Sequence, residues 1–233
     1  MASLPPERTT ISRPFTNCGA DFAGPFSLRR FRGRYSKITK GYACIFVCFA
    51  TRAIHVEAVN DLSTAAFLAA FARFVSRRGC PSRVYSDNGT NFQGASGELK
   101  KEARKFVEQS RLDIVAAYGL QDLSWHFIPA SALHMGGLWE AVVRIFKQHF
   151  RRITGSITYT FKEFSTVLAS IEACMNSRPP SAASSDLTAL TPGHFLVGGP
   201  ILAPAETQVS PNSISHLNRW QRVKAVAQDF CRR

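Results

Sequence analysis

The chain has 233 residues, of which 45% are hydrophobic and 19% are charged, so it suits a folded domain and excludes an intrinsically disordered chain. Its 29 basic residues exceed its 16 acidic residues to give a net charge of +13, which indicates a polyanionic partner, although charge that serves solubility is the alternative. The longest apolar run, Tyr42 to Ala50, is too short to span a bilayer, and no secretory signal is evident, so a soluble, intracellular protein without a membrane partner is expected.

The first part of the chain predicts an extended lead-in, three strands, a helix and a fourth strand. Residues 1–14 contain three prolines that oppose regular structure. Apolar or alternating runs predict strands at 15–26, 41–50, 51–59 and 83–86. The basic segment at 28–40 is expected to be a hairpin loop. A helix is predicted to begin after Asp61 or Ser63, either of which can cap it, and to end near Arg78, before a glycine.

The second part of the chain predicts three more helices and a fifth strand. The helical patterns cover residues 96–109, 137–153 and 161–177. The strand is expected at 124–128, where Pro129 stops it. Residues 15–180 therefore form one mixed α/β domain. Residues 181–233 are expected to be a linker and the start of a truncated C-terminal module, with a further helix near the end.

The six cysteines form no C-x-x-C pair, and several of them lie in apolar segments. Reduced core cysteines are therefore expected in preference to a zinc site or a disulfide framework.

Three acidic residues stand at the ends of predicted elements. Asp21 interrupts an apolar strand, Asp87 follows the fourth strand, and Glu140 lies just inside a helix. Carboxylate oxygens are the ligands that Mg²⁺ and Mn²⁺ prefer, and two such ions about 4 Å apart can hold the attacking and leaving oxygens of a phosphodiester exchange. The three acids therefore predict a site for two metal ions.

Each acid also has an ordinary explanation. A turn near Gly24-Pro25 could satisfy Asp21 at a strand end, and Asp-Asn-Gly at Asp87 is a common turn sequence. Glu140 could pair with Arg144 one helical turn away, an interaction worth about 0.3–0.5 kcal/mol. The metal site is favoured by the three together, in their order along the chain, and not by any one of them.

The segments around the acids resemble the integrase catalytic core of retroelements, most closely that of Bel/Pao-type LTR retrotransposons. The matching segments are Gly19 to Phe26, Tyr85 to Phe92, Trp125 to Pro129, His134 to Glu140, Glu172 to Pro179 and Leu190 to Leu196. No one segment is decisive, but the ordered set is specific and extends over most of the chain.

The resemblance implies a ribonuclease-H-like fold, in which helices flank a central mixed five-stranded sheet and the first and fourth strands are neighbours. It also implies an integrase that, with Mg²⁺ or Mn²⁺, processes the 3′ end of retroelement DNA and transfers it to target DNA in the nucleus, as a homo-oligomer. Asp21, Asp87 and Glu140 would be both the catalytic residues and the metal ligands. The zinc-binding N-terminal module usual in the family has no counterpart among the histidines and cysteines here.

A basic row on the predicted 137–153 helix is expected to bind DNA. Arg144, Lys147 and Arg151 follow Glu140 on one helical face, next to an apolar stripe. A solvated face is the alternative. Three further DNA-binding candidates, each also explained by local hydrogen bonding or capping, are Asn88, Asn91 and His134. The cluster from Arg29 to Arg34 could bind DNA, act as a nuclear address or be a solvated hairpin tip.

Two other functions are compatible with the sequence. One is a DNA- or protein-binding relic that keeps the integrase fold without catalysis. The other is a ribonuclease H, whose site would usually need a fourth carboxylate, and no fourth acid is evident.

Overall fold

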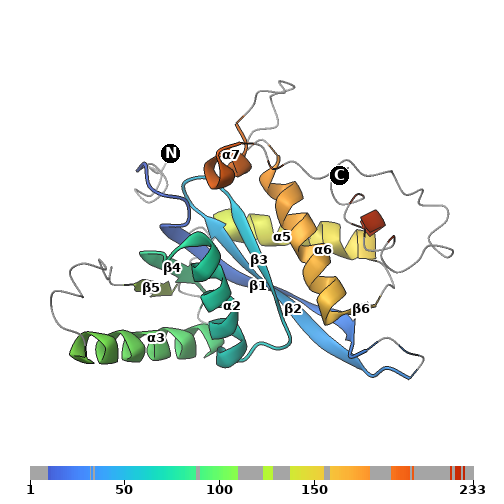
Figure 1. Cartoon of the computed structure of the whole chain (residues 1–233), viewed down its shortest axis with the longest axis horizontal. Helices are drawn as coiled ribbons and strands as arrows, with labels where there is room; N and C mark the ends of the chain where they lie inside the picture. The colour runs from blue at the N-terminus through green and yellow to red at the C-terminus, as the bar shows by residue number, and fades with distance from the viewer. Residues whose placement is uncertain are drawn as a thin grey trace.

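A central mixed sheet with the strand order β3-β2-β1-β4-β5 organises the chain in this computed structural model (Figure 1). The structure describes residues 10–31, 33, 35–87, 90–109, 123–127, 137–154, 158–178, 190–199, 201, 221, 224–226 and 228. Its strands are β1 (Asn17–Arg29), β2 (Ile38–Cys48), β3 (Ile54–Val59), β4 (Arg83–Ser86), β5 (Ser124–Phe127) and β6 (Tyr159–Thr160). Strands β1, β2 and β3 are antiparallel, whereas β1, β4 and β5 are parallel.

The five predicted strands are present, and β1 and β4 are neighbours as expected. Strand β6 is an addition of two residues that pairs with the far end of β1, and a run of two residues is too short to give a periodic pattern. The first two strands extend farther into the basic segment than predicted, so the hairpin loop is shorter than residues 28–40.

The helices are α2 (Thr64–Arg78), α3 (Thr90–Gln109), α5 (Gly137–Thr154), α6 (Phe161–Asn176) and α7 (Pro192–Val197). The Ser63 hydroxyl accepts a hydrogen bond from the Ala66 amide at the start of α2, so Ser63 is its cap. Helix α6 begins with a capping box between Thr160 and Glu163.

Two helical segments differ from the prediction. Helix α3 begins at Thr90 and not at residue 96. The predicted start was too late because the Asn- and Gly-rich sequence that follows β4 has the composition of a turn. Helix α7 lies in the segment expected to be a linker, where Thr191 precedes a proline at the first helical turn. Beyond it, residues 224–226 are helical, and Val226 is buried in the core.

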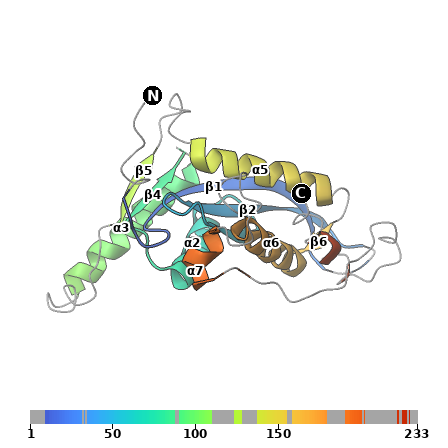
Figure 2. The same ribbon diagram turned by 90° about the horizontal axis from the view of Figure 1, so that it is seen from above.

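The sheet separates two hydrophobic cores. The alternation of β1 sends Gly19, Asp21 and Ala23 toward one face and their neighbours toward the other. Helices α5 and α6 supply the first core with Trp139, Val143, Phe146, Phe150, Phe164, Val167, Leu168 and Ile171. Helix α2 and the start of α3 supply the second core, in which Phe46 stacks on Phe74 with ring centroids 4.2 Å apart. Figure 2 shows α5 along β1 and β2, with α2 on the opposite side of the sheet.

Helix α6 protects the edge of the sheet at β3. Asn176, which is 1% exposed, accepts a hydrogen bond from the Ile54 amide at 2.8 Å and donates one to the Ile54 carbonyl at 2.9 Å. The Glu172 carboxylate accepts from the Val56 amide at 2.8 Å. Side chains of α6 therefore occupy the backbone groups that a neighbouring strand would use, which prevents pairing of β3 with another chain.

Two negative findings apply to the described part of the chain. None of its helices combines the length and apolarity that crossing a bilayer requires. Its five cysteines are free thiols, and all but Cys80 are buried, whereas Cys231 lies outside the described residues.

Candidate carboxylate site

The pairing of β1 with β4 determines where Asp21 and Asp87 lie. The two strands are parallel, and their last registered pair is Gly19 with Tyr85. Asp21 comes two residues after Gly19 and leaves the same face of β1, and Asp87 directly follows the end of β4. Because neighbouring strands are about 4.8 Å apart, the pairing brings the backbone at Asp87 near that of Asp21, and the charge of Asp87 acts on the Asp21 carboxyl group. The first and fourth strands are neighbours as predicted, but Asp21 lies inside β1 and not at its end.

Helix α5 approaches the same face through Trp139, the residue before Glu140. Trp139 is 5% exposed and stacks on Phe49 with ring centroids 5.4 Å apart. Its indole also covers Gly19, where a Cβ atom would lie 2.7 Å from the ring. Because only glycine permits this approach, Gly19 and Trp139 together fix the height of α5 above β1. Gly19, the first residue of the family-like segment from Gly19 to Phe26, is therefore a positioning residue, and the sequence alone did not predict this role.

Asp21 and Glu140 line one open pocket. Its other lining residues come from the same face of α5 and are Val143, Arg144, Lys147 and Gln148. Asp21 is half-buried and Glu140 is exposed. The structure thus brings together two of the predicted catalytic acids and two of the three predicted basic residues. For Arg151, only the helical backbone is described.

Burial and nearby charges act on Asp21 in opposite directions. Burial raises the pKa of its carboxyl group, and the negative charges of Asp87 and Glu140 raise it further. The hydrogen bond from the Phe22 amide, 2.6 Å from Oδ1, and the charge of Lys147 lower it, and the net pKa is above the ordinary value. Asp21 therefore lies within electrostatic range of both other acids and of the pocket lysine.

The end of β4 is held by a short hydrogen-bonded chain. The Trp125 indole donates to the Ser86 hydroxyl at 3.0 Å, and this hydroxyl donates to the Asp87 carbonyl at 2.9 Å. Ser86 is fully buried and Trp125 is 9% exposed. The backbone at Asp87 is thus anchored to β5, while the Asp87 side chain is exposed.

The donor set fits a hard divalent cation in its chemistry. Three carboxylates from β1, the end of β4 and α5 supply only oxygen ligands, and their mutual repulsion at Asp21 is what a cation would relieve. Across the described ranges, no three His, Cys, Asp or Glu side chains are already grouped to hold one ion. Asp87 is not among the pocket-lining residues, so gathering the three carboxylates requires its exposed side chain, and that of Glu140, to turn inward.

The remaining predicted DNA-binding residues lie elsewhere. Asn91 is half-buried at the start of α3, where its backbone carbonyl lies 3.5 Å from the Thr64 hydroxyl of α2. It does not belong to the lining of the pocket. Asn88 and His134 lie outside the described residues.

Replacing Gly19 with alanine is expected to lower the free energy of unfolding by roughly 1–3 kcal/mol, because the rigid indole of Trp139 leaves no room for the methyl group. Urea denaturation would measure the loss. Gly97→Ala is the matched control: it lies on α3 with no atom within 4 Å of the added Cβ, and we expect it to be neutral or stabilising. A Gly19→Ala protein as stable as the wild type would contradict the positioning role of Gly19.

Comparison with known proteins shows similarity in structure. No protein-family model matches the sequence, and a search of curated proteins finds no match. The chain is similar to one in the simian T-cell lymphotropic virus intasome in complex with PP2A regulatory subunit B56 gamma, with a TM-score of 0.50 and 12% identity over 86% of this chain and 63% of that chain. It is also similar to the HTLV-2 integrase catalytic core domain in complex with magnesium in its trimeric form, with a TM-score of 0.47 and 13% identity over 79% and 97% of the two chains.

The intasome likeness, at 12% identity, establishes the fold alone, and this chain spans less than two thirds of the matched chain. The mixed sheet flanked by helices is the ribonuclease-H-like fold of retroviral integrase cores, which confirms the fold predicted from sequence.

Proposed function

We propose that the chain is the catalytic core of a Bel/Pao-type LTR retrotransposon integrase, a metal-dependent polynucleotidyl transferase that processes and joins DNA ends. One observation carries the proposal: β1 and α5, far apart in sequence, bring Asp21 and Glu140 to one pocket, and Asp87 follows β4, the strand that pairs in parallel with β1. The net charge of +13 and the similarity of fold support a DNA substrate.

Each residue of the pocket has a role in this proposal. Asp21, Asp87 and Glu140 would hold two Mg²⁺ or Mn²⁺ ions. When bound, the ions supply activation of the attacking oxygen and stabilisation of the leaving 3′ oxygen. Arg144 and Lys147 would hold DNA phosphates against the pocket, and Val143 limits the access of water to its wall. DNA ends and a target strand would both need to be bound, for which a homo-oligomer in the nucleus is the proposed working form.

Lys147→Ala is expected to weaken DNA binding and to reduce the slope of log affinity against log salt by roughly 0.9, the value for one phosphate contact on duplex DNA. Lys147 is half-buried and lines the pocket, and its positive charge acts to lower the pKa of Asp21. Fluorescence anisotropy across a salt series would measure the slope. The control is Lys101→Ala, which removes an exposed cation paired with Glu98 on α3. An unchanged slope for Lys147→Ala would identify this helical face as merely solvated.

The alternative is a DNA- or protein-binding relic without catalysis, and the observation in its favour is that the three acids are not grouped around one point in the described structure. A joining assay separates the two functions. Labelled duplexes with randomised ends would be incubated with supercoiled plasmid, in Mn²⁺ or in EDTA. Covalent transfer of label to plasmid that depends on Mn²⁺ is expected from an integrase. Binding of DNA without any joining would establish the relic.

A further inference from the structure

We infer that the hairpin joining β1 to β2, residues 29–40 and here called the basic hairpin, is a second nucleic-acid-binding element that stacks on unpaired bases. It contains six basic residues and no acidic residue, namely Arg29, Arg30, Arg32, Arg34, Lys37 and Lys40. No acid occurs between Asp21 and Glu57 either. A surface with one sign of charge is complementary to a polyanion and unsuited to packing against another copy of itself.

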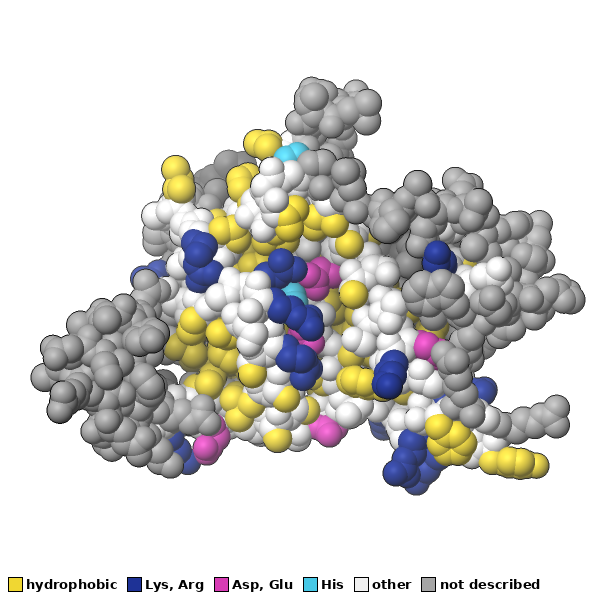
Figure 3. All heavy atoms as spheres, in the orientation of Figure 1, with side chains coloured by type: hydrophobic (Ala, Val, Ile, Leu, Met, Phe, Trp, Pro, Cys, Tyr) yellow, Lys and Arg dark blue, Asp and Glu magenta, His cyan; other side chains and the backbone are white. Residues whose placement is uncertain are grey.

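Aromatic side chains stand among these charges. Phe31 is 53% exposed and Tyr35 is 96% exposed, and Arg30, Lys37 and Lys40 are exposed around them. Figure 3 shows this mixture of basic and hydrophobic side chains projecting from the lower right of the molecule, where Figure 1 places the hairpin. Exposed aromatic rings between cations are the combination with which proteins bind single-stranded nucleic acid, because the rings stack on bases while the cations hold phosphates.

Hydrogen bonds hold the described residues of the basic hairpin on the approach to its tip and at its base. At the tip, the Arg30 amide donates to the Lys37 carbonyl at 3.2 Å, and the Phe31 amide donates to the Ser36 hydroxyl at 3.1 Å. At the base, β6 pairs with the end of β1, and the Arg29 guanidinium donates to the Thr158 hydroxyl at 2.6 Å. The rings are therefore presented to solvent from a braced support, which reduces the entropy lost on binding.

The basic hairpin also lies at the end of a basic track that begins at the carboxylate pocket. Helix α5 covers Gly19 with Trp139 and reaches Phe26 with Phe150, whose ring centroids are 4.6 Å apart, so it runs along β1 toward the basic hairpin. Arg144 and Lys147 lie on this path. Arg29 follows Asp21 by eight residues, which is about 26 Å of strand.

Unpaired bases are favoured over a duplex as the ligand. Inside a duplex the faces of the bases are covered by their neighbours, so Phe31 and Tyr35 could reach them only after unstacking. A frayed or single-stranded segment offers these faces directly, and it could reach the basic hairpin from the pocket over the roughly 26 Å of β1 that separate them.

Anisotropy of a labelled single strand of about 20 nucleotides, longer than the ~26 Å track, tests the inference. The buffer would contain EDTA, so that the result does not depend on the metal site or on catalysis. We expect Phe31→Ala combined with Tyr35→Ala to weaken single-strand binding at least roughly thirtyfold and to change duplex binding by less than about twofold. Replacing both residues with tryptophan should preserve binding, because stacking is retained.

Matched variants separate stacking from charge. Ile38→Ala removes an exposed, non-aromatic side chain of the same hairpin, 59% exposed, and should leave single-strand affinity unchanged. Arg30→Ala with Lys37→Ala should lower the salt slope for a single strand by roughly 1.4, which corresponds to two phosphate contacts. The Lys101→Ala variant should leave that slope unchanged.

Three results would overturn the inference. The first is single-strand affinity that is unchanged without both rings. The second is an equal loss on single strand and duplex. The third is a change of sedimentation coefficient in the aromatic variants with single-strand affinity intact, which would identify the basic hairpin as a contact between copies of the chain. Because binding is measured without metal, failure of the proposed transferase would leave these results interpretable.

Discussion

Asparagine in place of Asp87 is expected to reduce strand transfer at least about a hundredfold, since even outer-shell partners of a metal cost ten- to a hundredfold and a direct ligand costs more. The substitution keeps the size of the side chain and removes its single negative charge. Asp87 is exposed, and its backbone remains anchored through Ser86 and Trp125, so the fold should be retained. DNA binding should remain close to that of the wild type, because the phosphate-binding role is assigned to cations of α5.

The joining assay with Mn²⁺ and the anisotropy assay would be run side by side on Asp87→Asn. Glu98→Gln is the matched control, because it removes one negative charge from an exposed position on α3 that does not line the pocket. It should leave both activities unchanged. Undiminished strand transfer by Asp87→Asn would rule out Asp87 as a metal ligand.

The same variant gives a readout that needs neither metal nor DNA. The charge of Asp87 is one of the causes that raise the pKa of Asp21, after burial. In Asp87→Asn the pKa of Asp21 should therefore fall toward its ordinary value, and a carboxyl titration by NMR in EDTA would detect this. An unchanged pKa would mean that the two carboxylates are not neighbours in solution, whatever the result of the joining assay.

Much of the fold could be predicted from sequence because its elements have strong periodic patterns and clear ends. Strand β4 is short, but the sequence around Gly79 and Asp87 bounds it, and its predicted range agrees with the structure. Helix α7 was missed because six residues are too few for a helical pattern among prolines and glycines. The two-residue strand β6 exists only because β1 extends far enough to pair with it.

The candidate site was predictable as a set of residues but not as an arrangement. The sequence identifies the acids, and the strand order then puts Asp21 of β1 and Asp87, which follows β4, on neighbouring strands. The closeness of α5 depends on contact between Gly19 and Trp139, which are 120 positions apart, and no local pattern reveals such a contact. The segment from Glu172 to Pro179, one of those that carry the family resemblance, has a packing role. In the structure its Glu172 and Asn176 hold the edge of β3.

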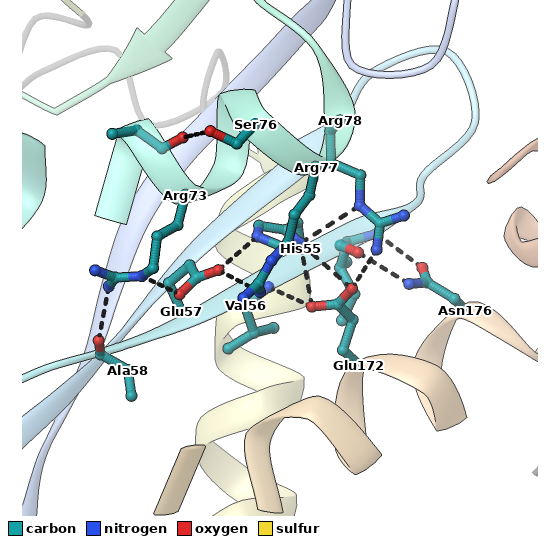
Figure 4. A network of polar contacts seen from close by, with 12 residues as sticks. His55, Val56, Glu57, Ala58, Arg73, Ser76, Arg77, Arg78, Glu172 and Asn176 are labelled. Carbon is teal, nitrogen blue, oxygen red and sulfur yellow. Dashed lines mark hydrogen bonds and ion pairs between the residues drawn. The ribbon is translucent and has the colours of Figure 1, made fainter. Parts of the chain in front are cut away.

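A buried network of charges joins β3, α2 and α6 near that edge (Figure 4). His55 is 1% exposed and lies between two carboxylates, 3.0 Å from Glu57 and 3.3 Å from Glu172. Arg73 and Arg77 pair with Glu57 at 2.7 and 2.8 Å, and Arg78 pairs with Glu172 at 2.5 Å. Each charge of this network thus has a partner of opposite sign.

Glu172→Ala is expected to lower the free energy of unfolding by about 3–5 kcal/mol, because it removes one of the two carboxylate partners of buried His55 and leaves the half-buried Arg78 and the Val56 amide without their acceptor. Urea denaturation would measure this loss. Thr166→Ala, at an exposed position of the same helix, is the control and should change stability by no more than about 0.5 kcal/mol. A small effect of Glu172→Ala would show that the network contributes little to the cohesion of α6 with the sheet.

The pH dependence of stability provides the sharper test of the network. Burial lowers the pKa of His55, but hydrogen bonds and the charges of Glu172 and Glu57 outweigh it and raise the pKa above 6.5, despite the Arg78 guanidinium 3.4 Å from Nδ1. The stability from His55 is therefore complete below pH 6.5 and is lost as the pH rises through the raised pKa. Burial also opposes ionisation of Glu57 and Glu172, yet their partners lower both pKa values below 4.5. The stability that these two carboxylates contribute is therefore complete above pH 4.5 and is lost as the pH falls through the lowered pKa values.

The excess stability of the wild type over Glu172→Ala should be largest between about pH 4.5 and 6.5 and should shrink on either side. A constant difference from pH 4 to 9 would contradict a charged His55 at the centre of the network.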